Sequence, residues 1–214
     1  MKTALTIVVM ATAASVAVAA QSTSPQMAAA AAPPEVVTMT MSGTIVQQYN
    51  DIKDLLTKTA DKMPAEAYLF QPMPEMRTFA GNMGHILASD ISQCGTLLGR
   101  KHPLSGQDLS KTLTTKAEVV KAAADTFAFC DEYFLKLNET TPLADSYVNM
   151  TGRRNGQPMV FKVSNGANVV HFLTHNNEEY GYLAVYMRLK GIVPPSSTPA
   201  TPSPGRGDGA GGGR

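Results

Sequence analysis

Residues 165–191, NGANVVHFLTHNNEEYGYLAVYMRLKG, carry the strongest structural signal in the chain. Their apolar residues recur at spacings of three and four, as on one face of a helix. These positions include Val169, Phe172, Leu173, Leu183 and Met187. Gly191 suits a left-handed helix cap, and two prolines follow soon after it. We therefore predict a helix from residue 164 or 165 to Lys190.

Three earlier segments show the same helical periodicity, at about 42–63, 77–98 and 115–137. The first has Ser42 as a candidate cap, and the third opens with the capping box Thr115-Lys116-Ala117-Glu118. Because the four helices are joined by variable loops, we predict an all-α fold, a four-helix up-down bundle.

A short β-hairpin is expected between the third and fourth helices. Residues 147–150 and 159–163 read as strands, and Arg154-Asn155-Gly156 lies between them as a turn. Two strands alone are marginally stable, so the small β-hairpin before the last helix must lie on the bundle.

The two ends of the chain differ in composition from the middle. Residues 1–20 have a lysine followed by a small-residue apolar stretch, which is typical of a signal peptide. Residues 21–40 are an Ala/Pro-rich spacer, and residues 194–214 are a Pro/Gly-rich tail; both are expected to be disordered. The bundle is then residues 41–193, and the protein is predicted to be exported, periplasmic or extracellular, without stable membrane insertion after cleavage.

The chain has 214 residues, with 18 Lys and Arg against 17 Asp and Glu, and therefore a formal net charge of +1. That balance argues against a nucleic-acid partner, because such proteins neutralise phosphates with basic patches. The two cysteines, Cys94 and Cys130, exclude a cysteine-based zinc cluster. They either pair after export or remain as buried thiols.

A polar ladder on the last helix is the main candidate for chemistry. His171, His175 and Glu179 are spaced four residues apart, so they share one helix face. Two side chains at this spacing can bind one metal ion, and a third ligand must come from another helix. His85 is the obvious candidate, and the adjacent Gly81 and Gly84 indicate either close packing or a site. Such a site suits Zn²⁺, Ni²⁺, Fe²⁺ or Mn²⁺.

Two stretches resemble a known family. Residues 175–197, HNNEEYGYLAVYMRLKGIVPPSS, resemble the final helix of the DinB-like proteins, which include YfiT-like metalloenzymes. Residues 72–88, PMPEMRTFAGNMGHILA, are similar to the second-helix segment of that family. The resemblance covers most of residues 42–197. It implies a four-helix bundle, commonly a homodimer, with three histidines around a divalent metal; its characterised members include thiol-dependent transferases and a maleylpyruvate isomerase.

The resemblance places the first metal ligand on His85, the second on His175 and the third on position 179, where this chain has Glu179 in place of histidine. Three interpretations remain open: a site of two histidines and one carboxylate, a site lost in this chain, or a site in which His171 replaces the missing imidazole.

These residues predict an exported metal-dependent enzyme of the transferase or hydrolase type, acting on an unknown small-molecule substrate. The alternative is a catalytically inert bundle that serves as a ligand-binding or structural module with a degenerate metal site. Metal occupancy should fall below about pH 6, because the neutral imidazole is the ligand.

Overall fold

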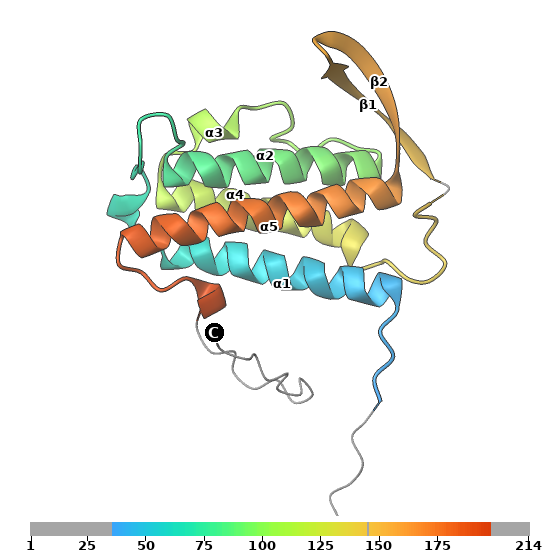
Figure 1. The fold of residues 1–214 in the computed structure, drawn as a ribbon, viewed down its shortest axis with the longest axis horizontal. Helices are drawn as coiled ribbons and strands as arrows, with labels where there is room; N and C mark the ends of the chain where they lie inside the picture. Colours follow the sequence, from blue (N-terminus) through green and yellow to red (C-terminus); the bar gives the residue numbers. More distant parts are fainter. Residues whose placement is uncertain (1–35, 145, 198–214) are drawn as a thin grey trace, which may run out of the picture. The chain divides into compact units, whose positions relative to one another are not determined.

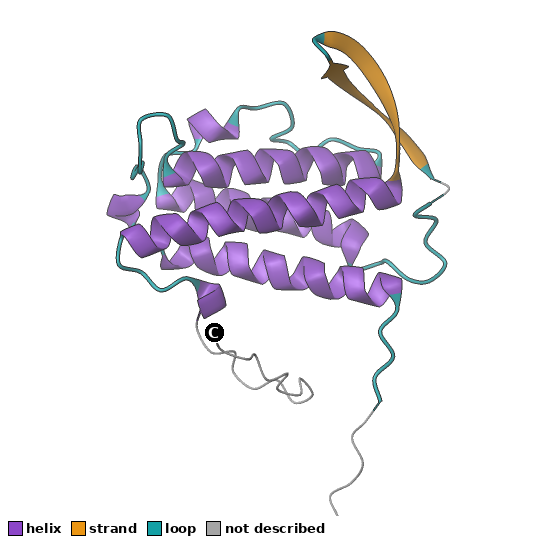
Figure 2. Cartoon of the chain, in the orientation of Figure 1, coloured by secondary structure: helices purple, strands orange, loops and turns teal. Residues whose placement is uncertain are grey.

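The computed structural model describes residues 36–144 and 146–197. Four long helices form the bundle: α1 (Met41–Lys62), α2 (Phe79–Leu98), α4 (Lys116–Phe134) and α5 (Asn165–Leu189). The shorter elements are η1 (Ala65–Ala67), α3 (Leu109–Thr112), β1 (Tyr147–Arg154), β2 (Gln157–Ser164) and η2 (Pro195–Ser197). The predicted helical bundle with a hairpin before the last helix is confirmed, but the hairpin extends away from the helices and does not lie on them as predicted (Figures 1 and 2).

The predicted signal peptide (1–20) lies outside the described residues, as do most of the predicted spacer (21–40) and tail (194–214). The first residues of the predicted tail pack on the bundle. Pro195 is buried in η2, and the backbone N–H of Ser196 donates to the hydroxyl of Tyr180 at 2.9 Å. Among the described helices, none combines the length and the apolar character that a membrane span requires.

Side-chain caps fix where the helices begin. Thr78 caps α2, and Thr115 caps α4 with the predicted capping box to Glu118. The cap of α1 is Thr40 rather than the predicted Ser42, because the Thr40 hydroxyl accepts from the backbone N–H of Gly43 at 3.1 Å.

The connection between α2 and α4 sets the topology of the bundle. Residues 99–115 cross back over α2 before α4 begins, so α2 and α4 run parallel, whereas a short loop would have made them antiparallel (Figure 1). α2 and α4 pack against each other. α2 also packs against α5, to which it is antiparallel, and α4 also packs against α1.

The hairpin is in register along its whole length, from Tyr147 paired with Ser164 to Arg154 paired with Gln157. Asn155 and Gly156 both have positive φ, 52° and 79°, as a two-residue type I′ turn requires. β2 leads directly into α5. Its last residue, Ser164, is also the cap of the helix, since its hydroxyl accepts from the backbone N–H of Ala167 at 3.1 Å.

Gly84, next to His85, is a point of close packing. A Cβ atom at this position would lie 2.1 Å from the carbonyl oxygen of Leu109 in α3. A Cβ at Gly81 would lie 3.0 Å from the carbonyl oxygen of Ser110. These two glycines therefore allow the backbone of α3 to lie directly on α2.

We predict that Gly84→Ala destabilises the protein by about 1–3 kcal/mol, because α3 must move away from α2. Gly181→Ala in α5 is the matched control, since a Cβ there meets nothing within 4 Å. Alanine is the better helix former by about 1 kcal/mol, so the control should gain stability. Urea unfolding of both variants checks this; equal gains would contradict the packing of α3 on α2.

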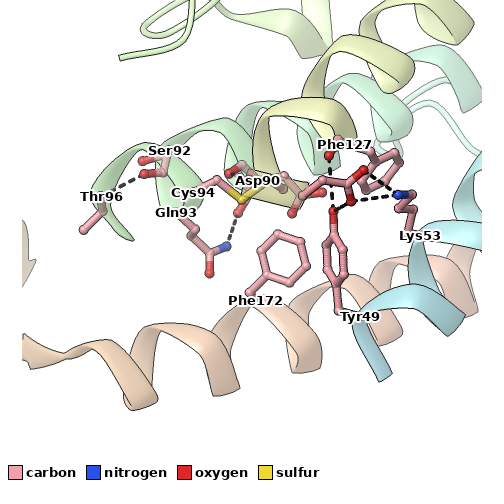
Figure 3. The surroundings of a disulfide bond; sticks show 12 residues. Tyr49, Lys53, Asp90, Ser92, Gln93, Cys94, Thr96, Phe127 and Phe172 are labelled. Atoms are coloured by element: carbon pink, nitrogen blue, oxygen red, sulfur yellow. Dashed lines mark hydrogen bonds and ion pairs between the residues drawn. A yellow bond between two sulfur atoms is a disulfide. The ribbon is translucent and has the colours of Figure 1, made fainter. Parts of the chain in front are cut away.

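Cys94 in α2 and Cys130 in α4 form a disulfide, with a Cα–Cα distance of 5.3 Å (Figure 3). Both side chains are fully buried. Of the two predicted states of these cysteines, the structure has the paired one. The bond ties together the two parallel helices that the long crossover connects.

Removing the disulfide with a Cys94→Ala, Cys130→Ala double variant should lower the free energy of unfolding by about 3–4 kcal/mol. The bond closes a loop between residues 36 apart in sequence, and in the chain-entropy model such a loop restricts the unfolded chain by this amount. Denaturant unfolding of the variant beside the oxidised wild type measures the difference; indistinguishable midpoints would refute it.

Candidate metal centre

The antiparallel packing of α2 against α5 brings the three predicted ligands together. His85 Nε2 lies 3.3 Å from His175 Nε2 and 3.5 Å from Glu179 Oε1. His175 Nε2 and Glu179 Oε1, one helical turn apart on α5, are separated by 3.8 Å. Within the described residues, His85, His175 and Glu179 form the group of metal-binding side chains whose ligand atoms converge.

The size of this triangle fits a first-row divalent metal. A point equidistant from three atoms with these separations lies about 2 Å from each of them. Zn²⁺ binds imidazole nitrogen and carboxylate oxygen at about 2.0–2.2 Å. The three atoms therefore need little rearrangement to bind one ion.

The group lies at the edge of the core and is open on one side. The side chain of His85 is 34% exposed, whereas those of His175 and Glu179 are 14% and 9% exposed. Burial lowers the pKa of His175, and the nearby Glu179 carboxylate works against that shift. His175 is therefore neutral at pH 7, which is the protonation state that binds a metal.

Two polar atoms of the group are buried without a hydrogen-bond partner among the described residues. They are Nδ1 of His175 and Oε2 of Glu179. Buried polar atoms in proteins are nearly always paired, and an ion bound at Nε2 and Oε1 would leave Nδ1 of His175 in need of another partner, such as a water molecule.

His171 does not belong to the group. Its ring nitrogens do not converge with the ligand atoms of the other three residues, and its side chain is exposed. The neighbouring Glu178 is also exposed and accepts a hydrogen bond from the Tyr182 hydroxyl at 2.9 Å. The structure thus gives no support to His171 as a replacement ligand.

Comparison with known proteins identifies the family. The family model of the DinB superfamily matches residues 48–183. This chain belongs to the DinB superfamily. The sequence resemblance to DinB-like proteins is therefore confirmed, and a search of curated proteins finds no match.

Solved structures show the same fold as this DinB-superfamily chain. A DinB-like protein from Bacillus cereus ATCC 10987 superimposes with a TM-score of 0.54 at 18% identity, over 74% of this chain and 98% of the other. A conserved protein from Enterococcus faecalis gives a TM-score of 0.53 at 13% identity, over 71% of this chain and 98% of the other.

Two buried polar side chains of α2 were not part of the predicted site. Asp90 is fully buried, and its Oδ1 accepts from Asn176 Nδ2 at 2.7 Å. Asp90 is thus a buried hydrogen-bond partner of α5. Asn82, one turn before His85, is only 4% exposed. In the sequence, Asn82 could have been noticed because it lies three residues before His85 and therefore on the same side of a helix.

The Asp90 carboxyl should make stability depend on pH. Burial raises its pKa from 3.8 to about 8, although the hydrogen bond from Asn176 works in the opposite direction. Between about pH 4 and pH 8, the Asp90 carboxyl is therefore protonated in the folded protein and ionised in the unfolded chain. Stability falls as the pH rises through this range.

Asp90→Asn keeps the shape and the Oδ1 acceptor but does not titrate. We expect its stability relative to wild type to rise by about 6 kcal/mol from pH 4 to pH 8, and then to level off. Urea unfolding of both proteins at each pH measures the difference, in which the contributions of unrelated groups cancel. A constant difference across this range would show that Asp90 is not buried in the protonated state.

Proposed function

We propose that this DinB-superfamily protein is an exported metal-dependent enzyme of the transferase or hydrolase type, with one divalent ion held by His85, His175 and Glu179. The convergence of three ligand atoms from two helices, at separations that match one ion, carries the proposal. The donor set of two imidazoles and one carboxylate suits Zn²⁺, Ni²⁺, Fe²⁺ or Mn²⁺.

The chemistry follows from the open side of the group. A bound divalent ion would lower the pKa of a water molecule or polarise an oxygen or thiol of the substrate. His85, the most exposed of the three ligands, marks the side from which a small-molecule substrate would approach. Glu179 brings a negative charge, which makes the site harder and more anionic than a set of three histidines.

Two observations support export. Residues 1–20 have the composition of a signal peptide, and Cys94 and Cys130 are joined in a buried disulfide, which is typical of oxidising compartments. Low-molecular-weight thiols are cytoplasmic cosubstrates, so export favours activation of water over thiol transfer. Fractionation of the native host tests this proposal, and recovery of the chain in the cytoplasm with residues 1–20 intact would refute it.

We also propose a homodimer, on the basis of the family resemblance. The outer face of α5 is compatible with it, because Val185 and Leu189 are 50% and 58% exposed. Sedimentation velocity gives the mass in solution, and a monomer at high protein concentration would exclude this proposal.

The metal proposal predicts about one first-row divalent ion per chain in protein purified at pH 7.5 without a chelator or a histidine tag. Loss of a side chain that only supports a metal ligand weakens metal binding roughly 10–100-fold. Alanine variants of His85, His175 or Glu179 remove a ligand itself, so each should weaken metal binding by more than this. His171→Ala is the matched control, and it should bind like wild type. Elemental analysis and metal titration provide the measurements, and occupancy should fall below about pH 6.

The rival function, a catalytically inert bundle that binds a ligand or partner, predicts the opposite result. Wild-type protein without metal near pH 7.5, but with normal helicity and thermal unfolding, would establish that the group of three side chains is structural. A His171→Ala variant that loses the metal would instead show that the ligand set is wrong.

A further inference from the structure

The outer oxygen of Glu179 is the unexplained atom of the metal centre. Oε1 faces the two imidazoles, at 3.5 Å from His85 Nε2 and 3.8 Å from His175 Nε2. Oε2 is buried and has no hydrogen-bond donor in the described part of the chain. A carboxylate that binds a metal through one oxygen usually has its other oxygen held by a hydrogen bond, which fixes its orientation.

Asn82 supplies a matching donor on the facing helix. Its side chain is 4% exposed, and its Nδ2 is buried with no acceptor among the described residues. Asn82 precedes His85 by three residues, so both lie on the same side of α2. α3 covers the side of α2 that carries Gly81 and Gly84, and His85, on the side of Asn82, faces Glu179 of α5.

Two contacts with α5, one from α2 and one from the residue just before its cap, show how far along the helix Asn82 lies. His85 is beside Glu179, and eight residues earlier the carbonyl oxygen of Arg77 accepts from the Tyr186 hydroxyl at 2.7 Å. Because the helices are antiparallel, residues 77–85 lie level with residues 179–186. Asn82 is therefore level with the turn of α5 that begins at Glu179.

We propose that Asn82 is a positioning residue of the metal centre: its amide N–H holds Oε2 of Glu179, directly or through one water molecule. Glu179 then binds the ion through Oε1 alone. This inference rests on the proposed metal site. Without the Asn82 donor, the Glu179 carboxylate is free to rotate, and its second oxygen can also bind the ion.

The test is titration of Co²⁺ into the metal-stripped full chain, followed by its visible absorption. The variants are Asn82→Ala and Asn82→Leu, the second of which keeps the side-chain volume. We expect roughly 10–100-fold weaker Co²⁺ binding than in wild type. The visible bands should also weaken, because a second carboxylate oxygen raises the coordination number and higher-coordinate Co²⁺ absorbs less strongly.

Asn168→Ala is the matched control. Asn168 is also a buried asparagine of the α2–α5 interface, at 1% exposed, but it donates to the carbonyl oxygen of Gln93 at 3.2 Å, two turns from His175. Its variant should lose stability while keeping the wild-type Co²⁺ affinity and spectrum. Thermal unfolding shows which variants fold; if Asn82→Ala does not, Asn82→Leu decides.

Four results would overturn the inference. Wild-type affinity and bands in Asn82→Leu would remove Asn82 from the centre and leave the metal site standing. The same loss in Asn168→Ala would show a general loosening of the helix pair. Weaker binding of Asn82→Leu with unchanged bands would exclude control of the carboxylate orientation. A wild-type protein that binds no Co²⁺ would refute both this inference and the proposed function.

Discussion

The antiparallel packing of α2 on α5 is the constraint on which the candidate centre depends. Neither helix carries three ligands by itself: α5 offers His175 and Glu179 one turn apart, and α2 adds His85 from the other side. A shift of one helix along the other by a single turn, about 5.4 Å, would separate His85 from both partners. The distances among the three side chains therefore depend on how firmly α2 is held.

Three neighbours hold α2 in place. α5 contacts it through the buried pair of Asp90 and Asn176, the Cys94–Cys130 disulfide ties it to α4, and the α3 backbone lies against Gly84. The polar pair is costly for the core, because burial keeps the Asp90 carboxyl protonated near neutral pH. A hydrogen bond between two buried polar groups is also directional, so it favours one alignment of α2 and α5 over the others.

Glu179 makes this member differ from the set of three histidines that the family resemblance implies. A carboxylate has two oxygens and a negative charge, whereas an imidazole offers one nitrogen at a fixed angle. It binds hard divalent ions well, but it needs a second contact to fix its orientation. A glutamate at position 179 is therefore compatible with a metal centre, and neighbouring side chains would set how its carboxylate is oriented.

The amino-acid sequence determined the helices, because their apolar spacing, caps and prolines are local features, and it placed His175 and Glu179 on one face of α5. It also indicated the hairpin through Asn155 and Gly156. Only the tertiary structure decided that residues 99–115 recross the bundle, that Cys94 pairs with Cys130, and that His171 stays outside the group while Asn82 and Asp90 are buried. These outcomes depend on the rotation and axial offset of one helix against another. Long-range packing sets both, and residue spacing within a single helix does not.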